Sequence, residues 1–546
     1  MPRTPLASSL RRLWRDLTLS RRTGVPVDEL RDRRADEAAR REQGRRGLTR
    51  RAVLGGAAAG AGALALPGRA RAAGSDPTVA IIGGGIAGMT CALTLLDKNI
   101  ESTVYEASGR IGGRMFSNRT GYWSAGQVSE WGGELIDTDH QTVQDLAARF
   151  GLPLDDLIAA QDPGADEIYR VFGSYYAKSQ ANADFDAIFH AVKADAKSAP
   201  FPTTWDSYTA AGATLDHLSV YDWIESRIPG GHASPLGRVL DLAYAIEFGA
   251  DTTEQSSLNL IYLLAFQPKP YDHTLAMFGV SDETYHIRGG NQQLPEAIAA
   301  YLGDRVVTNT RLSRLRETPN GRYRLTLECG NQTSEQVYDY VVLALPFSAY
   351  TFDYSQAGFD PLKLQAISEL GRGHNGKLHL QFDQRRWRGA GPWPELSSGT
   401  SYADTGYQSS WEVTRAQPGT PGILVLYSGG SVTDGMRSPA FATATDPRVR
   451  ADAHDGLAQI APVFPGLSWN GKATQSVWHR APLFNNSYAY YRPGNYTAFA
   501  GYEIEPQGNV YFCGEHTSID FQGYMEGGAS TGKATGKAVK KAIRGS

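Results

Sequence analysis

Cysteine is scarce in this sequence, and the few cysteines present show no functional spacing. Only 3 of the 546 residues are cysteines. Cys91, Cys329 and Cys513 show neither the spacing of a disulfide framework nor that of a zinc site, and we expect buried apolar thiols. The 11 histidines show neither H-x-x-x-H nor H-E-x-x-H spacing, which disfavours a metal hydrolase. We therefore predict no metal site.

A large excess of one charge and long apolar runs are also missing. The formal net charge is −3, so bulk electrostatics predict no nucleic-acid partner. The weakly apolar Gly/Ala run that ends at Leu66 is too short and too rich in glycine for a transmembrane helix, so we expect no stable membrane span. With 546 residues, of which 41% are hydrophobic, the chain is long enough for two domains with large cores.

Residues 1–73 differ from the rest of the chain because arginine is concentrated there. Adjacent arginines recur at Arg11-Arg12, Arg21-Arg22, Arg33-Arg34, Arg40-Arg41, Arg45-Arg46 and Arg50-Arg51. The last pair precedes the Gly/Ala run and a small-residue segment ending at Ala73, which is the order of an export signal. The pair resembles a twin-arginine signal, which exports folded proteins. We expect a secreted or periplasmic protein that uses the twin-arginine (Tat) machinery; the alternative is a disordered basic tail that binds nucleic acid or membrane.

The strongest motif begins at residue 79. Four apolar residues, Val79 to Ile82, predict a buried parallel strand, and glycines occupy the first, third and sixth places of the turn that follows. Gly83 suits a tight bend, Gly85 lets the backbone approach a pyrophosphate, and Gly88 lets the next helix pack close to the sheet. A second apolar run ends in Glu106, which can accept hydrogen bonds from both ribose hydroxyls. The spacing predicts a dinucleotide-binding βαβ unit.

Further glycine-rich runs indicate a ligand larger than this one turn would hold. The run from Glu106 to Arg114 contains one glycine pair, Gly132-Gly133 is another, and glycines surround Tyr524 near the C-terminus. With these motifs the sequence resembles the flavin-dependent amine oxidases, the family of monoamine, polyamine and L-amino-acid oxidases. In that family the E-A-x-x-R-x-G-G-R run lies along the FAD pyrophosphate. The closing block resembles the family's G-E-x-T…G-Y-x-x-G-A-x-x-S-G run, with Gly528 and Thr531 replacing the alanine and the serine.

The resemblance spans roughly residues 78–544 and implies an α/β fold with α+β character in the second domain. A Rossmann-like βαβ domain that binds FAD is expected to be interleaved with a sheet-rich substrate domain and a helical block. The expected segments are 1–73 for the basic extension and signal, 74–154, 286–345 and 501–546 for the FAD-binding domain, 155–285 for the helical block, and 346–500 for the substrate domain.

The motifs and the resemblance together name the residues expected to contact FAD. They are Gly83, Gly85, Ala87, Gly88, Glu106, Gly113, Arg114, Gly133, Glu134, Leu135, Leu312, Glu515, Gly523, Tyr524 and Met525. Monoamine oxidases carry a cysteine before a P-P-G turn, where the alignment on Arg492-Pro493-Gly494 places Asn486 and Ser487 here. The missing cysteine implies FAD held without a covalent link.

Two residues are predicted to take part in catalysis. By resemblance, Tyr524 matches one wall of an aromatic cage that flanks the substrate amine, and its quadrupole suits a passing amine; the alternative is a core tyrosine that packs the last helix. The family also has a lysine that orders water against flavin N5. Its expected place holds Thr351, and Lys377, which matches a different shared lysine, is the candidate. We expect Tyr488 and Trp411 to line the substrate cavity.

Substrate choice is less well determined by the sequence. Venom-type L-amino-acid oxidases bind the substrate carboxylate with the arginine of a G-P-M-R run, where Leu135 stands here. Arg288, Arg480 or Arg492 could replace it, because a planar guanidinium suits a carboxylate, and Arg492 is included among the substrate residues. A cluster that contains Glu412 could attract a second cationic amine, and Tyr407 and Gln408 belong to the same cluster.

The predicted function is an exported FAD-dependent amine oxidase. It would deaminate an L-amino acid or a primary amine by hydride transfer to flavin N5, with O2 reduced to H2O2. The alternatives are a polyamine oxidase, a flavin dehydrogenase or desaturase of the same fold that passes electrons to another acceptor, and a non-catalytic flavin-binding protein. A homodimer is a further expectation.

Overall fold

The computed structural model describes residues 77–545, so the predicted extension and export signal at 1–73 lie outside the described residues. Pro77–Gln267 and the chain from Tyr271 onward belong to one compact unit, which the following paragraphs describe. Within the described range, no helix has both the length and the apolar content that crossing a bilayer requires.

A five-stranded parallel sheet carries the glycine motif at its centre. Its strands in spatial order are β23 (Val510–Phe512), β13 (Tyr340–Leu343), β1 (Val79–Ile82), β2 (Ser102–Tyr105) and β9 (Val306–Val307). All four pairings between neighbouring strands of this sheet are parallel. The sheet thus joins three segments that are far apart in the sequence, as predicted for a domain interrupted by insertions.

Helices cover one face of this sheet and a second sheet covers the other. Val79 and Ile81 face α3 (Ile86–Leu96), α4 (Gln141–Arg149), α10 (Gln293–Leu302) and α15 (Met525–Arg544). Ala80 and Ile82 face the four-stranded sheet. That sheet has the order β12 (Gln332–Tyr338), β11 (Tyr323–Cys329), β10 (Arg311–Glu317) and β14 (Asp353–Gln356). Because both faces are covered, all four residues of β1 are buried, as its apolar run predicts.

Glycine lets the first and last helices of the described chain touch backbone to backbone. A Cβ on Gly532 of α15 would lie 2.1 Å from the carbonyl oxygen of Ala87 in α3. One on Gly536 would lie 3.0 Å from that of Cys91. Any side chain at these two positions would separate the helices.

The expectation of three buried thiols is wrong for one cysteine. Cys91 and Cys513 are buried, but Cys329 is exposed. It ends β11, directly before the turn at Gly330, where the strand leaves the sheet. A residue in a strand is buried only if its face of the sheet is covered and the strand does not end there. The local sequence around Cys329 shows neither of these features.

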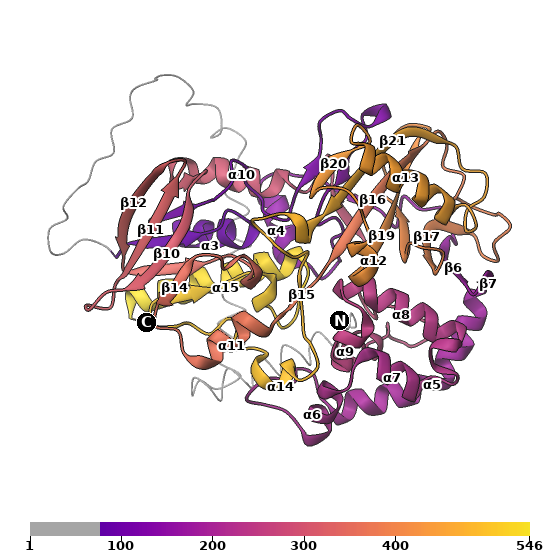
Figure 1. Ribbon diagram of the computed structural model, residues 1–546, viewed down its shortest axis with the longest axis horizontal. Coiled ribbons are helices and arrows are strands. Elements are labelled where there is room, and N and C mark those ends of the chain that lie inside the picture. The colour runs from indigo at the N-terminus through magenta and orange to yellow at the C-terminus, as the bar shows by residue number, and fades with distance from the viewer. Residues whose placement is uncertain (1–76, 546) are drawn as a thin grey trace, which may run out of the picture. The chain divides into compact units, whose positions relative to one another are not determined.

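An eight-stranded sheet forms the core of the second part of the unit (Figure 1). Its strands in spatial order are β20 (Phe441–Thr443), β21 (Trp469–Val477), β16 (Asn375–Phe382), β19 (Gly422–Gly429), β18 (Ser409–Glu412), β17 (Ser397–Ala403), β6 (Asp166–Val171) and β7 (Ser174–Tyr176). In β16, Leu378 and Leu380 pack with α13 (Pro447–Ile460). Because side chains alternate along a strand, Lys377 points to the opposite face.

The predicted helical block contributes both helices and strands. Its helices are α5 (Lys178–Ser198), α6 (Ala210–His217), α7 (Val220–Arg227), α8 (Pro235–Phe248) and α9 (Ser257–Leu264). They share a core that includes Trp223 and Tyr244. The segment 166–176, however, forms β6 and β7 at the edge of the eight-stranded sheet, with β6 parallel to β17. This pairing is with residues more than two hundred positions away, which a local pattern does not reveal.

The remaining elements are short. Paired strands are β3 (Ser117–Asn118) with β4 (Ser129–Glu130), β5 (Leu154–Asp156) with β8 (Tyr285–Ile287), and β15 (Gly371–Arg372) with β22 (Ala489–Tyr490). The other helices are α11 (Pro361–Glu369), α12 (Gly430–Asp434) and α14 (Asn495–Phe499).

Candidate functional site

A cavity of about 320 Å³ extends between the parallel sheet and the eight-stranded sheet. At one end its lining comes from the glycine turn after β1 and the run that ends at Arg114. At the other end it comes from the last turn of α8, from Lys377 of β16 and from Trp411 of β18. One continuous space therefore connects the predicted cofactor residues with the predicted substrate domain, as expected for a site where a cofactor meets a substrate.

The three positions of the turn require glycine for different reasons. Gly83 has a φ of +111°, and a Cβ there would lie 2.6 Å from the carbonyl oxygen of Ala344. A Cβ on Gly88 would lie 2.0 Å from the oxygen of Gly83. The fold itself therefore needs both glycines. Gly88 packs inside the turn and does not line the cavity, although it was predicted to contact FAD. Its close approach to Gly83 is the helix packing for which the fingerprint needs a glycine.

Gly85 is not required by the fold. Its φ is −76° and it precedes α3 as the N-cap without a side-chain hydrogen bond. The first atom that a Cβ on Gly85 would meet is the Cα of Gly113, at 3.9 Å, and both residues line the cavity. A missing side chain at a free helix N-terminus leaves room for an anion to approach the backbone. The turn therefore fits the pyrophosphate of FAD.

Glu106 is held in place by backbone groups of the same turn. One carboxylate oxygen accepts a hydrogen bond from the Gly84 N–H at 2.7 Å, and the other accepts one from the Ser108 N–H at 2.8 Å. Glu106 lines the cavity together with Leu312 of β10. This arrangement fixes an acidic side chain where the fingerprint predicts the ribose.

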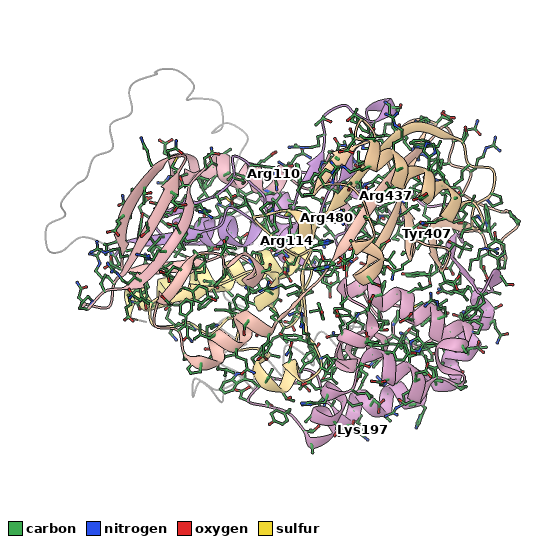
Figure 2. All side chains as sticks on the ribbon, in the orientation of Figure 1. Arg110, Arg114, Lys197, Tyr407, Arg437 and Arg480 are labelled. Atoms are coloured by element: carbon green, nitrogen blue, oxygen red, sulfur yellow. The ribbon has the colours of Figure 1, made fainter. Side chains whose placement is uncertain are left out.

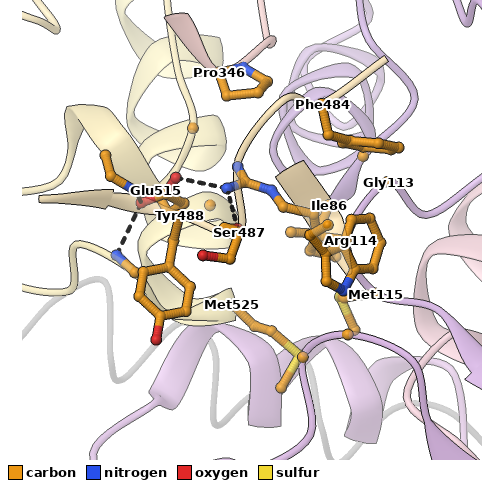
Figure 3. Close-up of a pocket in the computed structure, with 18 of the residues that line it drawn as sticks. Ile86, Gly113, Arg114, Met115, Pro346, Phe484, Ser487, Tyr488, Glu515 and Met525 are labelled. Carbon is orange, nitrogen blue, oxygen red and sulfur yellow. Dashed lines mark hydrogen bonds and ion pairs between the residues drawn. The ribbon is translucent and has the colours of Figure 1, made fainter. Parts of the chain in front are cut away.

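Arg114 and Glu515 join the two glycine-rich ends of the chain (Figure 3). The guanidinium of Arg114 donates to Glu515 Oε1 at 2.8 Å and to the Ser487 carbonyl at 2.7 Å. The other carboxylate oxygen of Glu515 accepts the N–H of Gly523 at 2.9 Å. These bonds bring residues from three distant segments to the cavity wall, where Met525 also lies.

Two tyrosines from different segments form aromatic walls at the other end of the cavity. The ring of Tyr488 lies 3.7 Å from where a Cβ on Gly523 would stand, which places it beside the neighbouring Tyr524. The Tyr488 hydroxyl donates to the carbonyl of Ile246 at 2.7 Å. The Tyr524 hydroxyl donates to Glu247 Oε1 at 2.9 Å. The last turn of α8 thus holds both rings, and no motif in the sequence had pointed to this turn.

Lys377, Glu134 and Trp411 form a buried polar group in the same cavity. The Lys377 ammonium donates to Glu134 Oε2 at 2.6 Å and to the Gly132 carbonyl at 2.9 Å. Trp411 donates its indole N–H to Glu134 Oε1 at 3.0 Å. Burial alone would raise the pKa of Glu134, but the Lys377 charge and these hydrogen bonds lower it. Glu134 is thus held ionised, and it neutralises Lys377.

Two further carboxylates line the cavity. Burial raises the pKa of Glu247 to about 8; the hydrogen bond from Tyr524 opposes the rise, and the charges of Glu283 and Asp137 add to it. Desolvation at the cavity wall raises the pKa of Glu283 to about 7, with the charge of Asp137 adding to the rise and that of Arg415 opposing it. Sequence reasoning missed both glutamates because they lie outside every motif, and only the fold brings them to the cavity.

Arg492 does not line the cavity, although it was predicted to contact substrate. Neither of the other two candidate arginines lines it. Arg288 is largely exposed and pairs with Asp155, and Arg480 donates to backbone carbonyls near α12 (Figure 2). The position of a side chain relative to a cavity depends on the tertiary fold, which the sequence around each arginine does not reveal.

The cluster around Glu412 also lies outside the cavity lining. Glu412 is paired with Arg388 and accepts the indole N–H of Trp387. Tyr407 hydrogen-bonds to Ser401, and Gln408 accepts a backbone N–H. These are structural contacts within the sheet-rich part. Of the predicted cofactor, catalytic and substrate residues, the structure brings all except Gly88 and Arg492 to one cavity.

Comparisons with known proteins agree with this geometry. A family model described as flavin containing amine oxidoreductase matches residues 86–539. A flavin-containing amine oxidase of Danio rerio is 23% identical over 485 residues, covering 82% of this chain and 83% of that protein. An L-amino-acid oxidase of Siganus canaliculatus is 23% identical over 459 residues, covering 81% of each. The solved structure of cyclohexylamine oxidase from Brevibacterium oxydans IH-35A has a TM-score of 0.70 at 21% identity, covering 86% of this chain and 100% of that one; it shows the shared fold.

Proposed function

The chain belongs to the flavin-containing amine oxidoreductase family, and from this premise we propose that it deaminates a primary amine with O2 as electron acceptor. As a member of this family it is an FAD-dependent oxidoreductase that acts on CH–NH2 groups. The substrate, the acceptor and the products are the parts that we propose.

The cofactor is FAD, held without a covalent bond. Among the residues that line the cavity there is no cysteine and no histidine to form a link. Gly85, Gly113, Glu106 and Arg114 would hold it, as the space beside Gly85 indicates. The chemistry that FAD supplies when bound is acceptance of a hydride at N5 and return of both electrons to O2 as H2O2. The imine that leaves is hydrolysed by water to a carbonyl compound and ammonia.

The protein's own contribution is orientation and exclusion of water. Tyr488 and Tyr524 both line the cavity, and we propose that a neutral amine lies against their rings. The last turn of α8 keeps both rings in place through their hydroxyl groups. Lys377 places a buried ammonium group at the same cavity, and its hydrogen bond to Glu134 fixes the position of this group.

We choose an amine over an amino acid as substrate because every cation in the cavity lining is already paired. Among the described residues the lining contains three, Arg114, Arg311 and Lys377. Each is paired with a glutamate, namely Glu515, Glu328 and Glu134 respectively. No lining cation is left to bind a substrate carboxylate. A primary amine is therefore favoured over an L-amino acid.

We expect aliphatic or aromatic primary amines to bleach the flavin of the anaerobic holoenzyme. L-amino acids should bleach it about a hundredfold more slowly or not at all, because their carboxylate meets unpaired glutamates and no free cation. The measurement is absorbance of bound flavin by stopped flow against a panel of amino acids, polyamines and monoamines. If amino acids bleach the flavin as fast as the best amine, the substrate proposal is wrong.

Oxygen as acceptor is tested separately from the substrate. Aerobic turnover should consume O2 and form peroxide, so that adding catalase returns half of the oxygen. A protein whose flavin is bleached by amines but is not reoxidised by air would be a dehydrogenase that needs another electron carrier.

The sequence also predicts where the protein is located and which proteins it interacts with. We propose export through the Tat machinery, on the basis of Arg50-Arg51 followed by the Gly/Ala run and a small-residue segment. A homodimer stays a prediction, which sedimentation of the holoenzyme would test.

Changing Arg50 and Arg51 together to lysine should keep the protein in the cytoplasm, folded and yellow. The reason is that the export machinery reads the arginine pair, while the change preserves charge. The matched control is Arg45→Lys with Arg46→Lys, which alters a pair outside the signal order and should leave export unchanged. Flavin and activity are measured in cytoplasmic and exported fractions; equal export of both double variants would contradict the signal assignment.

A further inference from the structure

Two carboxylates in the cavity lining have no cationic partner among the lining residues. The lining contains five glutamates, Glu106, Glu134, Glu247, Glu283 and Glu515. Backbone N–H groups or cations hold three of them. Glu247 receives only the neutral hydroxyl of Tyr524. Glu283 accepts no hydrogen bond from any side chain or backbone group of the described residues.

The backbone presents Glu283 to the cavity in an unusual conformation. Its φ is +46°, in the left-handed region that disfavours a residue with a side chain. Asp137 holds this turn: it accepts the Glu283 N–H at 2.9 Å and the Ser281 hydroxyl at 2.7 Å. Glu283 is exposed, and it lines the cavity. A glutamate held in this backbone region at a cavity wall favours a functional role there.

The charged residues around Glu283 do not include a cation that is hydrogen-bonded to it. Asp137, Asp282 and Glu134 are of the same sign. Arg415 is of opposite sign, but its hydrogen bonds go to the Glu412 carbonyl and to Gln161, and it does not line the cavity. The Glu283 carboxylate thus has no hydrogen-bonded cation among the described residues, and a ligand cation in the cavity could pair with it.

Glu247 adds a second attraction for a cation at the same place. It lies in the last turn of α8, where the helix dipole is negative and favours positive charge. The charges of Glu247 and Glu283 interact with each other, so both act on the same region of the cavity. The aromatic walls of Tyr488 and Tyr524 lie next to it, and they suit the amine that reacts.

We propose that Glu283, assisted by Glu247, binds a second ammonium group of the substrate, so that the preferred substrate is a diamine. One amine would lie between the two tyrosine rings and react, while the other, still protonated, would pair with Glu283. This inference rests on the proposed amine oxidation and names the class of amine. It also differs from the sequence prediction, which placed the attraction for a second amine at Glu412.

The test compares each diamine with the monoamine of the same chain length on the holoenzyme. Diaminobutane is paired with butylamine, diaminohexane with hexylamine and diaminooctane with octylamine, each diamine carrying an amine at both ends. Anaerobic stopped flow gives the flavin reduction rate divided by the apparent Kd. At the best chain length the diamine should exceed its monoamine by about tenfold to hundredfold, the worth of a hydrogen bond to a charged group. The advantage should peak at one length, because the two sites lie a fixed distance apart.

Glu283→Gln should bring the diamine-to-monoamine ratio close to one, because the amide keeps the shape and loses the charge. The matched control is Glu335→Gln, which removes the same charge from an exposed position on β12 and should preserve the ratio. Glu247→Gln gives a second variant, expected to lower the ratio by less. Flavin content confirms that each variant is loaded.

The outcomes separate the two proposals. If monoamines and diamines bleach the wild-type flavin equally at every length, or if Glu283→Gln keeps the ratio, the diamine site is overturned while amine oxidation stands. If no amine of any kind bleaches the flavin, the proposed function fails first. Because the wild-type comparison needs no variant, a Glu283→Gln protein that fails to fold would still leave the inference tested.

Discussion

Replacing Gly85 with valine should yield a folded protein that carries no FAD. The backbone of Gly85 is extended, with φ −76° and ψ 175°, which valine adopts readily. The nearest atom to a new Cβ is 3.9 Å away, so the fold has room for it. The added methyl groups would occupy the space beside the N-terminus of α3 that the pyrophosphate needs.

The measurement is flavin absorbance relative to protein, together with circular dichroism of the purified variant. The matched control is Gly88→Val, where a Cβ would lie 2.0 Å from the carbonyl oxygen of Gly83; this variant should lose the fold along with the flavin. A Gly85→Val protein with a full complement of FAD would show that the turn does not hold the pyrophosphate.

Changing Tyr524 to alanine should leave FAD bound and slow flavin reduction roughly tenfold to hundredfold. Its ring is placed to guide the amine, and a lost orienting contact of ~1–3 kcal/mol gives a rate change of that size. Tyr524→Phe keeps the ring and loses the bond to Glu247. Its reduction rate should stay close to that of wild type, with a loss of stability of about 1 kcal/mol from the missing donor.

A purely structural role for Tyr524 predicts a different pattern. The ring packs edge-on against His140, with centroids 5.2 Å apart, and Tyr524 directly precedes α15. If packing were its only role, the alanine variant would lose stability and flavin together, and the remaining holoenzyme would be reduced at a normal rate. Stopped-flow reduction of flavin-loaded Tyr524→Ala distinguishes the two roles, because the rate per bound flavin is independent of how much protein is loaded.

Local spacing in the sequence was sufficient to identify residues at the cofactor end of the cavity. The apolar run at β1, the glycines after it and Glu106 all lie within one short βαβ segment, where backbone geometry relates residue order directly to position. The same holds for the turn before α15, whose glycines and Glu515 are close in sequence. The twin-arginine prediction also rests on sequence alone; it concerns residues outside the described range and stays a prediction.

The substrate end depended on the tertiary structure, because its residues are adjacent only after folding. Lys377 and Glu134 are 243 positions apart in the chain, and Tyr524 and Glu247 are 277 apart. The sequence alone determined that the chain has a dinucleotide turn, a flavin family resemblance and an aromatic candidate in Tyr524. Only the fold decided that Arg492 and Glu412 lie away from the cavity and that Glu247 and Glu283 line it. The physical reason is that side-chain charge acts through space, and the distances between these groups are set by how sheets and helices pack.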